Sequence, residues 1–217
     1  MTTVYLIRHS VRMKNNLIES YNTHQDKTIQ NEKVILSVLG ERRAEILANE
    51  EELQNIDVVY TSSSVRTLET AKYLIEKQNL KVNIDERLNE RVAGIPNENE
   101  VVDWKKQYED PTYKTTNGES QLDVRKRFEE SFNEIIKNNK DKRIAIFSHG
   151  YAITFFLLKY CKLLPFKDDK LNYEYNGKIL FNKTINAPEV FKMIIDGDNV
   201  IDIELIEFAD LPFEFGV

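Results

Sequence analysis

Two short segments, far apart in the chain, most constrain what this sequence can fold into. Residues 6–10 read Leu-Ile-Arg-His-Ser and residues 146–150 read Ile-Phe-Ser-His-Gly. Each is an apolar run that ends abruptly in a polar cluster with a histidine, the pattern of a buried strand that reaches the edge of a sheet. Ligands of open α/β sheets bind at the carboxyl edge of the strands. We therefore expect both imidazoles to lie at a ligand site.

The periodicity of the apolar residues predicts strands that alternate with helices. Strands are expected over residues 3–7, 57–61, 82–84 and 143–147, and helices over residues 39–53, 64–78, 119–139 and 151–164. Late in the chain, Gly197-Asp198-Asn199 separates two further strands, 191–196 and 200–208, as in a hairpin. The alternation predicts an α/β fold with a mostly parallel sheet, helices on both faces and a late antiparallel hairpin.

We expect residues 1–217 to form one domain, because no linker, internal repeat or low-complexity tract interrupts the chain. Two stretches depart from the regular pattern. Residues 95–116 contain Pro96 and Pro111 and show little periodicity, and residues 165–190 are largely polar. Long segments without regular structure are usually functional in compact domains. Both stretches are therefore predicted to be inserts that cap the site.

The composition excludes several classes of protein. The net charge is −6, which argues against general affinity for nucleic acid or for an acidic membrane surface. A few arginines could still create a small positive pocket. The sequence has no secretory signal and no apolar run of ~18 residues, the length that spans a membrane. The single cysteine, Cys161, can form no internal disulfide, so we expect a cytoplasmic protein.

Arginine and histidine occur together where the first strand ends. A guanidinium can grip phosphate oxygens through two hydrogen bonds, and an imidazole can act as nucleophile, acid–base group or metal ligand. Arg8 and His9 could therefore bind phosphate, or could form a surface pair that only solvates a loop. His149 and Arg66 each lie where a strand gives way to a helix, whose N-terminus favours anions.

Other kinds of site find little support in the sequence. No metal site is expected, because the two histidines have no cysteine or carboxylate at ligand spacing. The chain also lacks the Gly-x-Ser-x-Gly motif of serine hydrolases and the glycine-rich Walker loop. The residues thus favour phosphate chemistry that uses a histidine and needs no cofactor.

In their order along the chain, these motifs resemble those of the histidine phosphatase superfamily, also called phosphoglycerate mutase-like. The matching segments are Arg8-His9, Leu36-Ser37-x-Leu39-Gly40, residues 60–71 with Arg66, Leu88-Asn89-Glu90 with Gly94, residues 117–120 (Asn-Gly-Glu-Ser) and residues 147–150 (Phe-Ser-His-Gly). Together they span residues 3–155. The resemblance implies a three-layer α/β/α sandwich and a covalent phosphohistidine.

The resemblance also implies a role for each matching residue. It identifies His9 as the nucleophile, Glu90 as the proton donor to the leaving group and His149 as a catalytic residue that contacts the phosphoryl oxygens. It places Arg8 and Arg66 in the same phosphate pocket.

Further positions accompany this set. Asn15 matches an additional phosphate-contacting asparagine of the family, and Arg12 is an extra cation that could contact the substrate or be solvated. Ser10 stands where the family usually has a glycine, and residues 95–97 (Ile-Pro-Asn) replace a frequent Trp-Glu-Gly. These departures bear on the choice of substrate more than on the core chemistry.

The function that the resemblance implies is a phosphatase that hydrolyses a small phosphomonoester. Two alternatives stay open: a phosphoglycerate mutase, which returns the phosphoryl group to its substrate, and a regulatory module that binds phosphate without turnover. The expected partner is a small-molecule phosphate ester, with no nucleic acid and no membrane. The sequence leaves the oligomeric state open.

Overall fold

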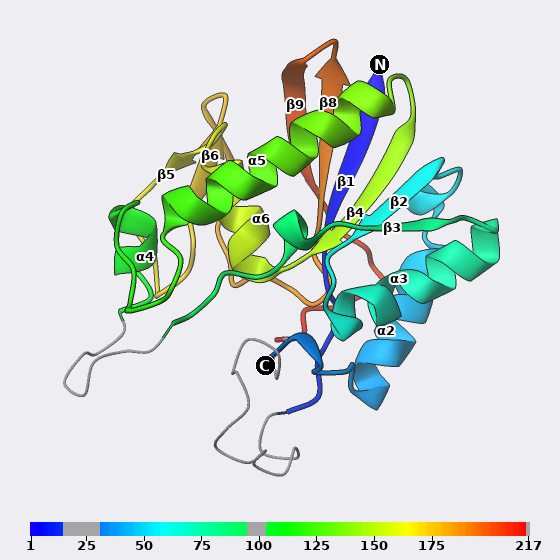
Figure 1. Cartoon of the computed structure of the whole chain (residues 1–217), viewed down its shortest axis with the longest axis horizontal. Coiled ribbons are helices and arrows are strands. Elements are labelled where there is room, and N and C mark those ends of the chain that lie inside the picture. The colour runs from blue at the N-terminus through cyan, green and yellow to red at the C-terminus, as the bar shows by residue number, and fades with distance from the viewer. Residues whose placement is uncertain (15–30, 95–102, 216–217) are drawn as a thin grey trace.

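The centre of the fold is a six-stranded sheet. The structure is a computed structural model that describes residues 1–14, 31–94 and 103–215. The strand order is β3-β2-β4-β1-β8-β9 (Figure 1). The strands are β1 (Thr2–Arg8), β2 (Val58–Thr61), β3 (Val82–Ile84), β4 (Arg143–Ser148), β8 (Val190–Asp196) and β9 (Asn199–Ile206). The first four strands in this order pair in parallel, and β8 pairs antiparallel with β1 and β9. The predicted parallel sheet with a late hairpin is confirmed.

Helices cover both faces of this sheet, which confirms the three-layer prediction (Figure 1). One layer is α2 (Val38–Asn49) with α3 (Val65–Gln78), and the other is α5 (Gln121–Asn138) with α6 (Gly150–Leu157). Side chains of β1 alternate between the two layers, as the strand period of two requires. Tyr5 and Ile7 pack in the core under α2 and α3. Val4 and Leu6 pack in the core under α5 and α6.

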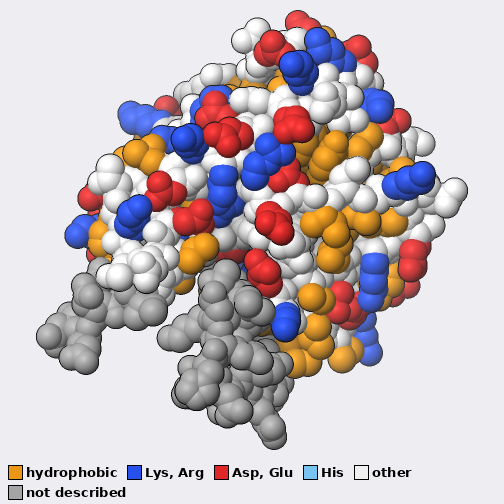
Figure 2. Space-filling view, in the orientation of Figure 1, with side chains coloured by type: hydrophobic (Ala, Val, Ile, Leu, Met, Phe, Trp, Pro, Cys, Tyr) orange, Lys and Arg blue, Asp and Glu red, His pale blue; other side chains and the backbone are white. Residues whose placement is uncertain are grey.

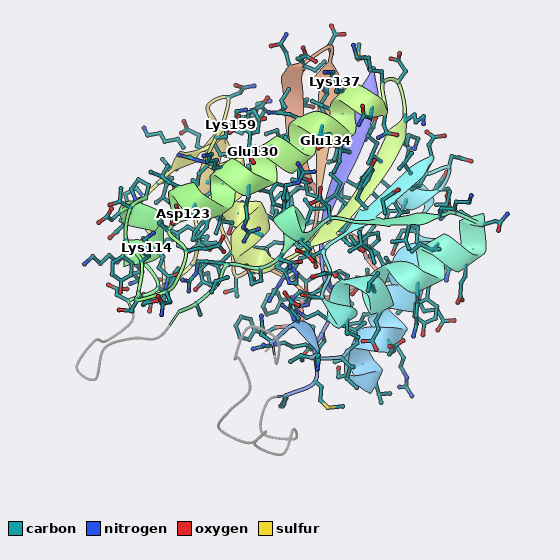
Figure 3. The ribbon with its side chains drawn as sticks, viewed as in Figure 1. Lys114, Asp123, Glu130, Glu134, Lys137 and Lys159 are labelled. Atoms are coloured by element: carbon teal, nitrogen blue, oxygen red, sulfur yellow. The ribbon has the colours of Figure 1, made fainter. Side chains whose placement is uncertain are left out.

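α5 shows how the sequence orients a helix on the sheet. Its start is fixed by a capping box, in which the Ser120 and Asp123 side chains each accept a hydrogen bond from the other residue's backbone N–H. Phe128 and Phe132 are fully buried on its inner face. Glu130 and Lys137, two of the labelled charged residues, lie on its exposed surface (Figure 3). Acidic and basic groups mix over this surface (Figure 2).

The predicted helix over residues 151–164 is wrong in its second half. α6 ends at Leu157, and Lys162–Leu163 forms a strand, β5. Three successive hydrogen bonds after the helix, beginning with the Leu158 N–H to the Phe155 carbonyl, join residues three apart and tighten the last turn. The chain then turns so that Lys162 pairs with Glu174. This pairing with a segment further along the chain overrides the local helical pattern.

The polar stretch 165–190 contains regular structure that the sequence analysis did not predict. β6 (Tyr173–Tyr175) and β7 (Lys178–Phe181) form a three-stranded antiparallel sheet with β5. Asn176 and Gly177 make the turn with φ of 48° and 76°. Asn-Gly between two strands is the strongest short signal for a hairpin, because both residues tolerate positive φ. The signal was therefore present in the sequence.

The capping role of the two inserts stays a prediction. In the first insert, residues 95–102 lie outside the described residues, and α4 (Lys106–Glu109) follows them. In the second, the Ile185 and Asn186 carbonyls accept hydrogen bonds from Arg8, so this stretch reaches the end of β1. Across the described ranges, no helix combines the length and the apolar character that crossing a bilayer requires.

Candidate active site

The two histidines lie side by side because their strands are neighbours in the sheet. β1 and β4 pair in parallel, with Arg8 opposite Ser148, so the residues that follow each strand emerge at the same edge. The His9 and His149 ring centroids are 5.3 Å apart, with an angle of 64° between the ring planes. The structure therefore brings the two predicted imidazoles together at one edge of the sheet.

The contacts of His9 define which of its ring nitrogens carries a proton. Nδ1 lies 2.8 Å from the carbonyl oxygen of Ser10. Since a carbonyl can only accept, Nδ1 is the donor, and Nε2 of the neutral ring keeps a free lone pair. Burial, together with the charges of Arg66 and Arg8, holds the pKa of His9 well below its usual value. His9 is thus a neutral imidazole, the form that can act as a nucleophile.

His149 is held in the opposite tautomer. The Arg66 guanidinium donates from Nη2 to its Nδ1 over 2.9 Å. Because Nδ1 accepts, the ring proton lies on Nε2, which donates to the Ser62 hydroxyl at 2.8 Å. Burial and the charge of Arg66 hold the pKa of His149 well below its usual value. The ring is therefore neutral and fixes the orientation of Arg66.

Arg8 and Arg66 both bring buried guanidinium groups to this edge. Arg8 donates from Nη1 to the carbonyls of Ile185 (2.8 Å) and Asn186 (3.0 Å). Arg66, at the start of α3, donates from Nη1 to the Asn31 carbonyl at 2.5 Å. Burial lowers the pKa of each guanidinium to about 10, so both stay charged at neutral pH.

The Nε–H groups of both guanidiniums, on Arg8 and Arg66, are buried donors without an acceptor in the described part of the chain. Buried donors without partners are rare and costly, and they are common where a ligand binds. An oxyanion, with several acceptor oxygens and a negative charge, is the ligand that suits two such cations.

The carboxylate of Glu90 contacts the N-terminus of α6, directly after His149. Three backbone N–H groups donate to this carboxylate, from Arg91 (2.9 Å), Ala152 (3.1 Å) and Tyr151 (3.3 Å). The charge of Glu90 acts to raise the pKa values of Arg8 and Arg66, against the stronger effect of burial, so the carboxylate lies near both. The structure thus places Glu90 beside the histidines and arginines with which the sequence grouped it.

Of the two further positions predicted to contact phosphate, the structure describes Arg12 but not Asn15. Arg12 is half-buried, and its charge lowers the pKa values of Arg8, His9 and Arg66, so it lies close to the pocket. Asn15 lies outside the described residues. No group of three or more His, Cys, Asp or Glu side chains is arranged to hold a metal ion in ranges 1–14, 31–94 and 103–215.

Two residues that contribute to the site, Ser62 and Arg127, were not predicted from the sequence as site residues. Ser62 orients His149, and its signal was its place directly after β2, at the same sheet edge as the histidines. Arg127 in α5 binds the backbone of the segment that carries Glu90, including the Glu90 carbonyl. No local pattern identifies Arg127, because its partners come from another part of the chain.

Ser10 is accommodated by turning its side chain away from the site. Its hydroxyl donates to the Gly40 carbonyl at 2.8 Å, and its backbone N–H donates to the Thr70 hydroxyl at 2.9 Å. A glycine at position 40 lets α2 approach the backbone after β1 closely, because a Cβ there would lie 2.0 Å from the Val11 carbonyl oxygen. The serine therefore anchors the turn whose carbonyl holds His9.

Replacing Ser10 with alanine should lower the free energy of unfolding by ~1 kcal/mol and leave kcat/KM within about twofold of the parent value. The change removes one buried hydrogen bond and leaves the Gly40 carbonyl without this donor. Urea denaturation of both proteins measures the difference. A large loss of activity at unchanged stability would contradict a purely structural part for the hydroxyl.

The two buried histidines should make the protein less stable as the pH falls. Above pH ~6.5 an imidazole is neutral in the folded and unfolded chain alike. Below that value the unfolded chain takes up protons on His9 and His149, whereas the folded chain, with both pKa values depressed, does not. The unfolding free energy therefore falls by up to ~1.4 kcal/mol per pH unit for each imidazole. Urea denaturation between pH 7 and pH 5 measures this slope.

The variant His9→Gln isolates one imidazole in this measurement. Over the same pH range, its unfolding free energy should change less steeply with pH than that of the parent. The difference should be up to ~1.4 kcal/mol per pH unit, which corresponds to one proton, since the glutamine does not titrate. Equal slopes for the two proteins would show that His9 titrates normally in the folded state.

A family model and a known protein match most of this chain. The family model for the histidine phosphatase superfamily (branch 1) matches residues 4–177. The probable phosphoglycerate mutase GpmB of Yersinia enterocolitica is 28% identical over 180 residues, which are 79% of this chain and 80% of that protein.

Solved structures share the fold. The phosphoserine phosphatase of Entamoeba histolytica, in complex with 3-phosphoglyceric acid, has a TM-score of 0.64 at 21% identity and covers 97% of this chain and 100% of its own. YhfR of Bacillus stearothermophilus has a TM-score of 0.62 at 24% identity and covers 92% and 94% of the two chains.

Proposed function

Since the chain belongs to the histidine phosphatase superfamily, we propose that it is a phosphatase that hydrolyses a small phosphomonoester through a phosphohistidine on His9. The observation that carries the proposal is the state of His9 and its neighbours. Its Nε2 has a free lone pair, and it lies in one buried cluster with the unpartnered Nε groups of Arg8 and Arg66. A nucleophile and two fixed cations are what phosphoryl transfer most requires from a protein.

In the first step, His9 Nε2 attacks phosphorus in line with the ester oxygen. The N–P bond forms as the P–O bond to the leaving alcohol breaks. Arg8 and Arg66 stabilise the charge on the equatorial oxygens, and His149 holds Arg66 in place through Nδ1. Arg12 adds a further positive charge beside the pocket.

Glu90 completes the proton transfers. Its carboxylic acid protonates the leaving oxygen, so that the product departs as a neutral alcohol. The resulting carboxylate then takes a proton from the water that attacks the phosphohistidine, which releases inorganic phosphate and restores neutral His9 and protonated Glu90. The backbone N–H groups of Arg91, Tyr151 and Ala152 donate hydrogen bonds to this carboxyl group and fix its position at the site.

Trapping the covalent intermediate tests the proposal. After incubation with a radiolabelled phosphomonoester and a quench in alkali, we expect label on the protein that survives base and is lost in mild acid, as for a phosphorus–nitrogen bond. Release of inorganic phosphate should accompany it. Turnover without any such label in a rapid quench would show that water attacks the ester directly.

A phosphoglycerate mutase is the second candidate, and the similarity to a probable phosphoglycerate mutase favours it. The two functions differ in the acceptor of the phosphoryl group. With phosphoglycerate as substrate, a mutase yields the isomer and depends on bisphosphoglycerate, whereas a phosphatase yields inorganic phosphate without it. Phosphate binding without any turnover on a panel of esters would instead favour a regulatory module.

A further inference from the structure

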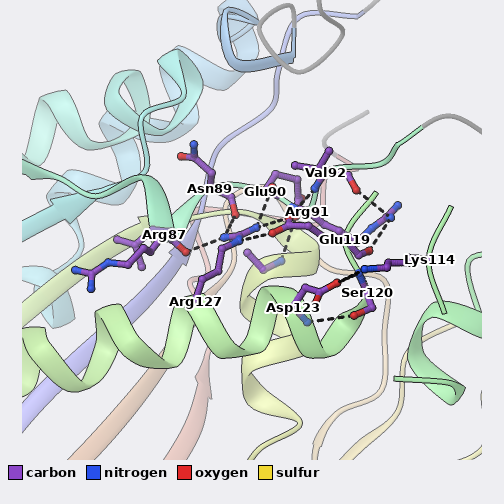
Figure 4. A network of polar contacts seen from close by, with 12 residues as sticks. Arg87, Asn89, Glu90, Arg91, Val92, Lys114, Glu119, Ser120, Asp123 and Arg127 are labelled. Atoms are coloured by element: carbon purple, nitrogen blue, oxygen red, sulfur yellow. Dashed lines mark hydrogen bonds and ion pairs between the residues drawn. The ribbon is translucent and has the colours of Figure 1, made fainter. Parts of the chain in front are cut away.

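A single arginine, Arg127, binds three backbone carbonyls in and just before the segment that carries Glu90. Residues 89–94, which follow the short 3-10 helix Glu86–Leu88, contain no helix or strand. Arg127, in the middle of α5, donates from Nη1 to the backbone carbonyls of Arg87 (2.7 Å) and Asn89 (2.8 Å). It donates from Nη2 to the carbonyl of Glu90 itself at 3.2 Å. Figure 4 shows these contacts converging on one guanidinium.

Glu119 holds this guanidinium in turn. Its carboxylate accepts from Arg127 Nε at 2.7 Å and from Nη2 at 2.8 Å, the paired geometry that favours arginine over lysine. It also accepts from the Val92 N–H at 2.8 Å, and its own N–H donates to the Val92 carbonyl at 2.9 Å. The backbone is therefore held on both sides of Glu90. Arg127 binds carbonyls up to and including that of Glu90, and Glu119 binds Val92, two residues after it.

This arrangement uses the full donor capacity of the arginine. A guanidinium has five N–H groups, and each of the five has an acceptor here: two carboxylate oxygens of Glu119 and three backbone carbonyls. Burial acts to raise the pKa of the Glu119 carboxyl, but the hydrogen bonds and charge of Arg127 outweigh it and hold that pKa below its usual range. The pair therefore stays ionised at neutral pH.

We propose that Arg127 is a positioning residue for the Glu90 carboxyl group and that Glu119 fixes Arg127 for this task. The proposal depends on the proposed function, in which Glu90 is the proton donor. The backbone of Glu90 is held by α5 through Arg127, and its carboxylate is held by the first N–H groups of α6. The carboxyl position is thus defined between two packed helices, and releasing one end lets it shift relative to the reacting oxygen.

The kinetic signature of such a shift differs from that of a weakened fold. A proton donor matters for a poor leaving group, such as an alkyl alcohol, and little for p-nitrophenolate, which leaves without protonation. A displacement of about 1 Å can cost ~10²-fold in rate. Arg127→Lys keeps the charge but not the five-donor fork. It should therefore lower kcat/KM for an alkyl phosphate by ~10- to 100-fold and for p-nitrophenyl phosphate by less than about threefold.

Two further variants make the comparison specific. Glu90→Gln is the reference, and it should show the same dependence on leaving group with a larger loss on the alkyl phosphate, ~10²-fold or more. Arg87→Lys is the matched control. Arg87 lies in the adjacent 3-10 helix, and its side chain bonds Asp85 and Glu134, away from Glu90 (Figure 4). It should reduce activity equally, if at all, on both substrates.

The outcomes separate the two proposals. If Glu90→Gln shows no dependence on leaving group, the proposed role of Glu90 fails. If Glu90→Gln shows it and Arg127→Lys loses activity equally on both substrates or not at all, the positioning role of Arg127 fails. Should Arg127→Lys not fold, Glu119→Gln replaces it. This variant leaves the three carbonyl contacts of Arg127 in place and weakens the ion pair that holds its guanidinium. If Glu119→Gln loses more activity on the alkyl phosphate than on p-nitrophenyl phosphate, even by a smaller factor, the proposal is supported. An equal loss on both substrates overturns it.

Discussion

Replacing His9 with alanine should lower kcat/KM for a phosphomonoester by roughly 10⁴- to 10⁶-fold, the range seen when a covalent nucleophile is removed. The reason is that the remaining groups stabilise charge but offer no atom to accept the phosphoryl group. The side chain is buried and, among the described residues, makes a single hydrogen bond, to the neighbouring carbonyl, so its removal leaves the strand β1 intact. Steady-state assays and rapid-quench labelling measure the effect.

The control for His9→Ala is retained binding of the product. Inorganic phosphate should still bind, since Arg8 and Arg66 are unchanged, and calorimetric titration reports it directly. His149→Ala is the matched histidine variant, and its loss should be smaller, on the order of 10²- to 10³-fold, because that ring orients a donor and does not form the bond. If the His9→Ala protein still formed a base-stable label, the nucleophile would have to be another residue.

Replacing Arg66 with lysine should lower kcat/KM by roughly 10²- to 10³-fold, the cost of losing one fixed donor to the developing charge. Lysine keeps the positive charge but lacks both the Nε donor and the fork that bonds Asn31 and His149. His149 then loses the partner that fixes its tautomer. Kinetics on p-nitrophenyl phosphate measure this loss without involving the proton donor.

Arg12→Lys is the matched control for Arg66→Lys. Arg12 lies close enough for its charge to act on Arg66, but it is half-buried rather than enclosed. We expect a smaller loss, below about tenfold, because solvent screens a charge that lysine retains. Equal losses for the two variants would indicate that the pocket needs only net positive charge, and that the fixed geometry of Arg66 contributes nothing.

Much of the fold follows from local patterns in the sequence. The apolar runs that form β1 and β4 are buried on both faces, so their residues could alternate between two cores without polar interruption. The capping box at Ser120 marks the start of α5 for the same local reason. The helix predicted through residue 164 failed because pairing between Lys162 and Glu174 depends on a segment further along the chain.

The candidate site, too, was predictable from the sequence only in part. Arg8, His9 and His149 could be grouped from the sequence, because each follows a strand and strand ends collect at one edge of a parallel sheet. Their tautomers could not, since these depend on the Ser10 carbonyl and on the contact between Arg66 and His149. The departure at Ser10 also became clear only when its hydroxyl was seen on the Gly40 carbonyl.

The sequence by itself determined that the two histidines and Arg8 would meet at the carboxyl edge of a parallel sheet, because hydrophobic periodicity sets which segments are strands and where each one ends. Only the tertiary structure decided which nitrogen of each histidine carries the proton and that Arg127 holds the backbone of Glu90. Hydrogen bonds of this kind join groups far apart in the chain, and their geometry is defined only once the layers have packed.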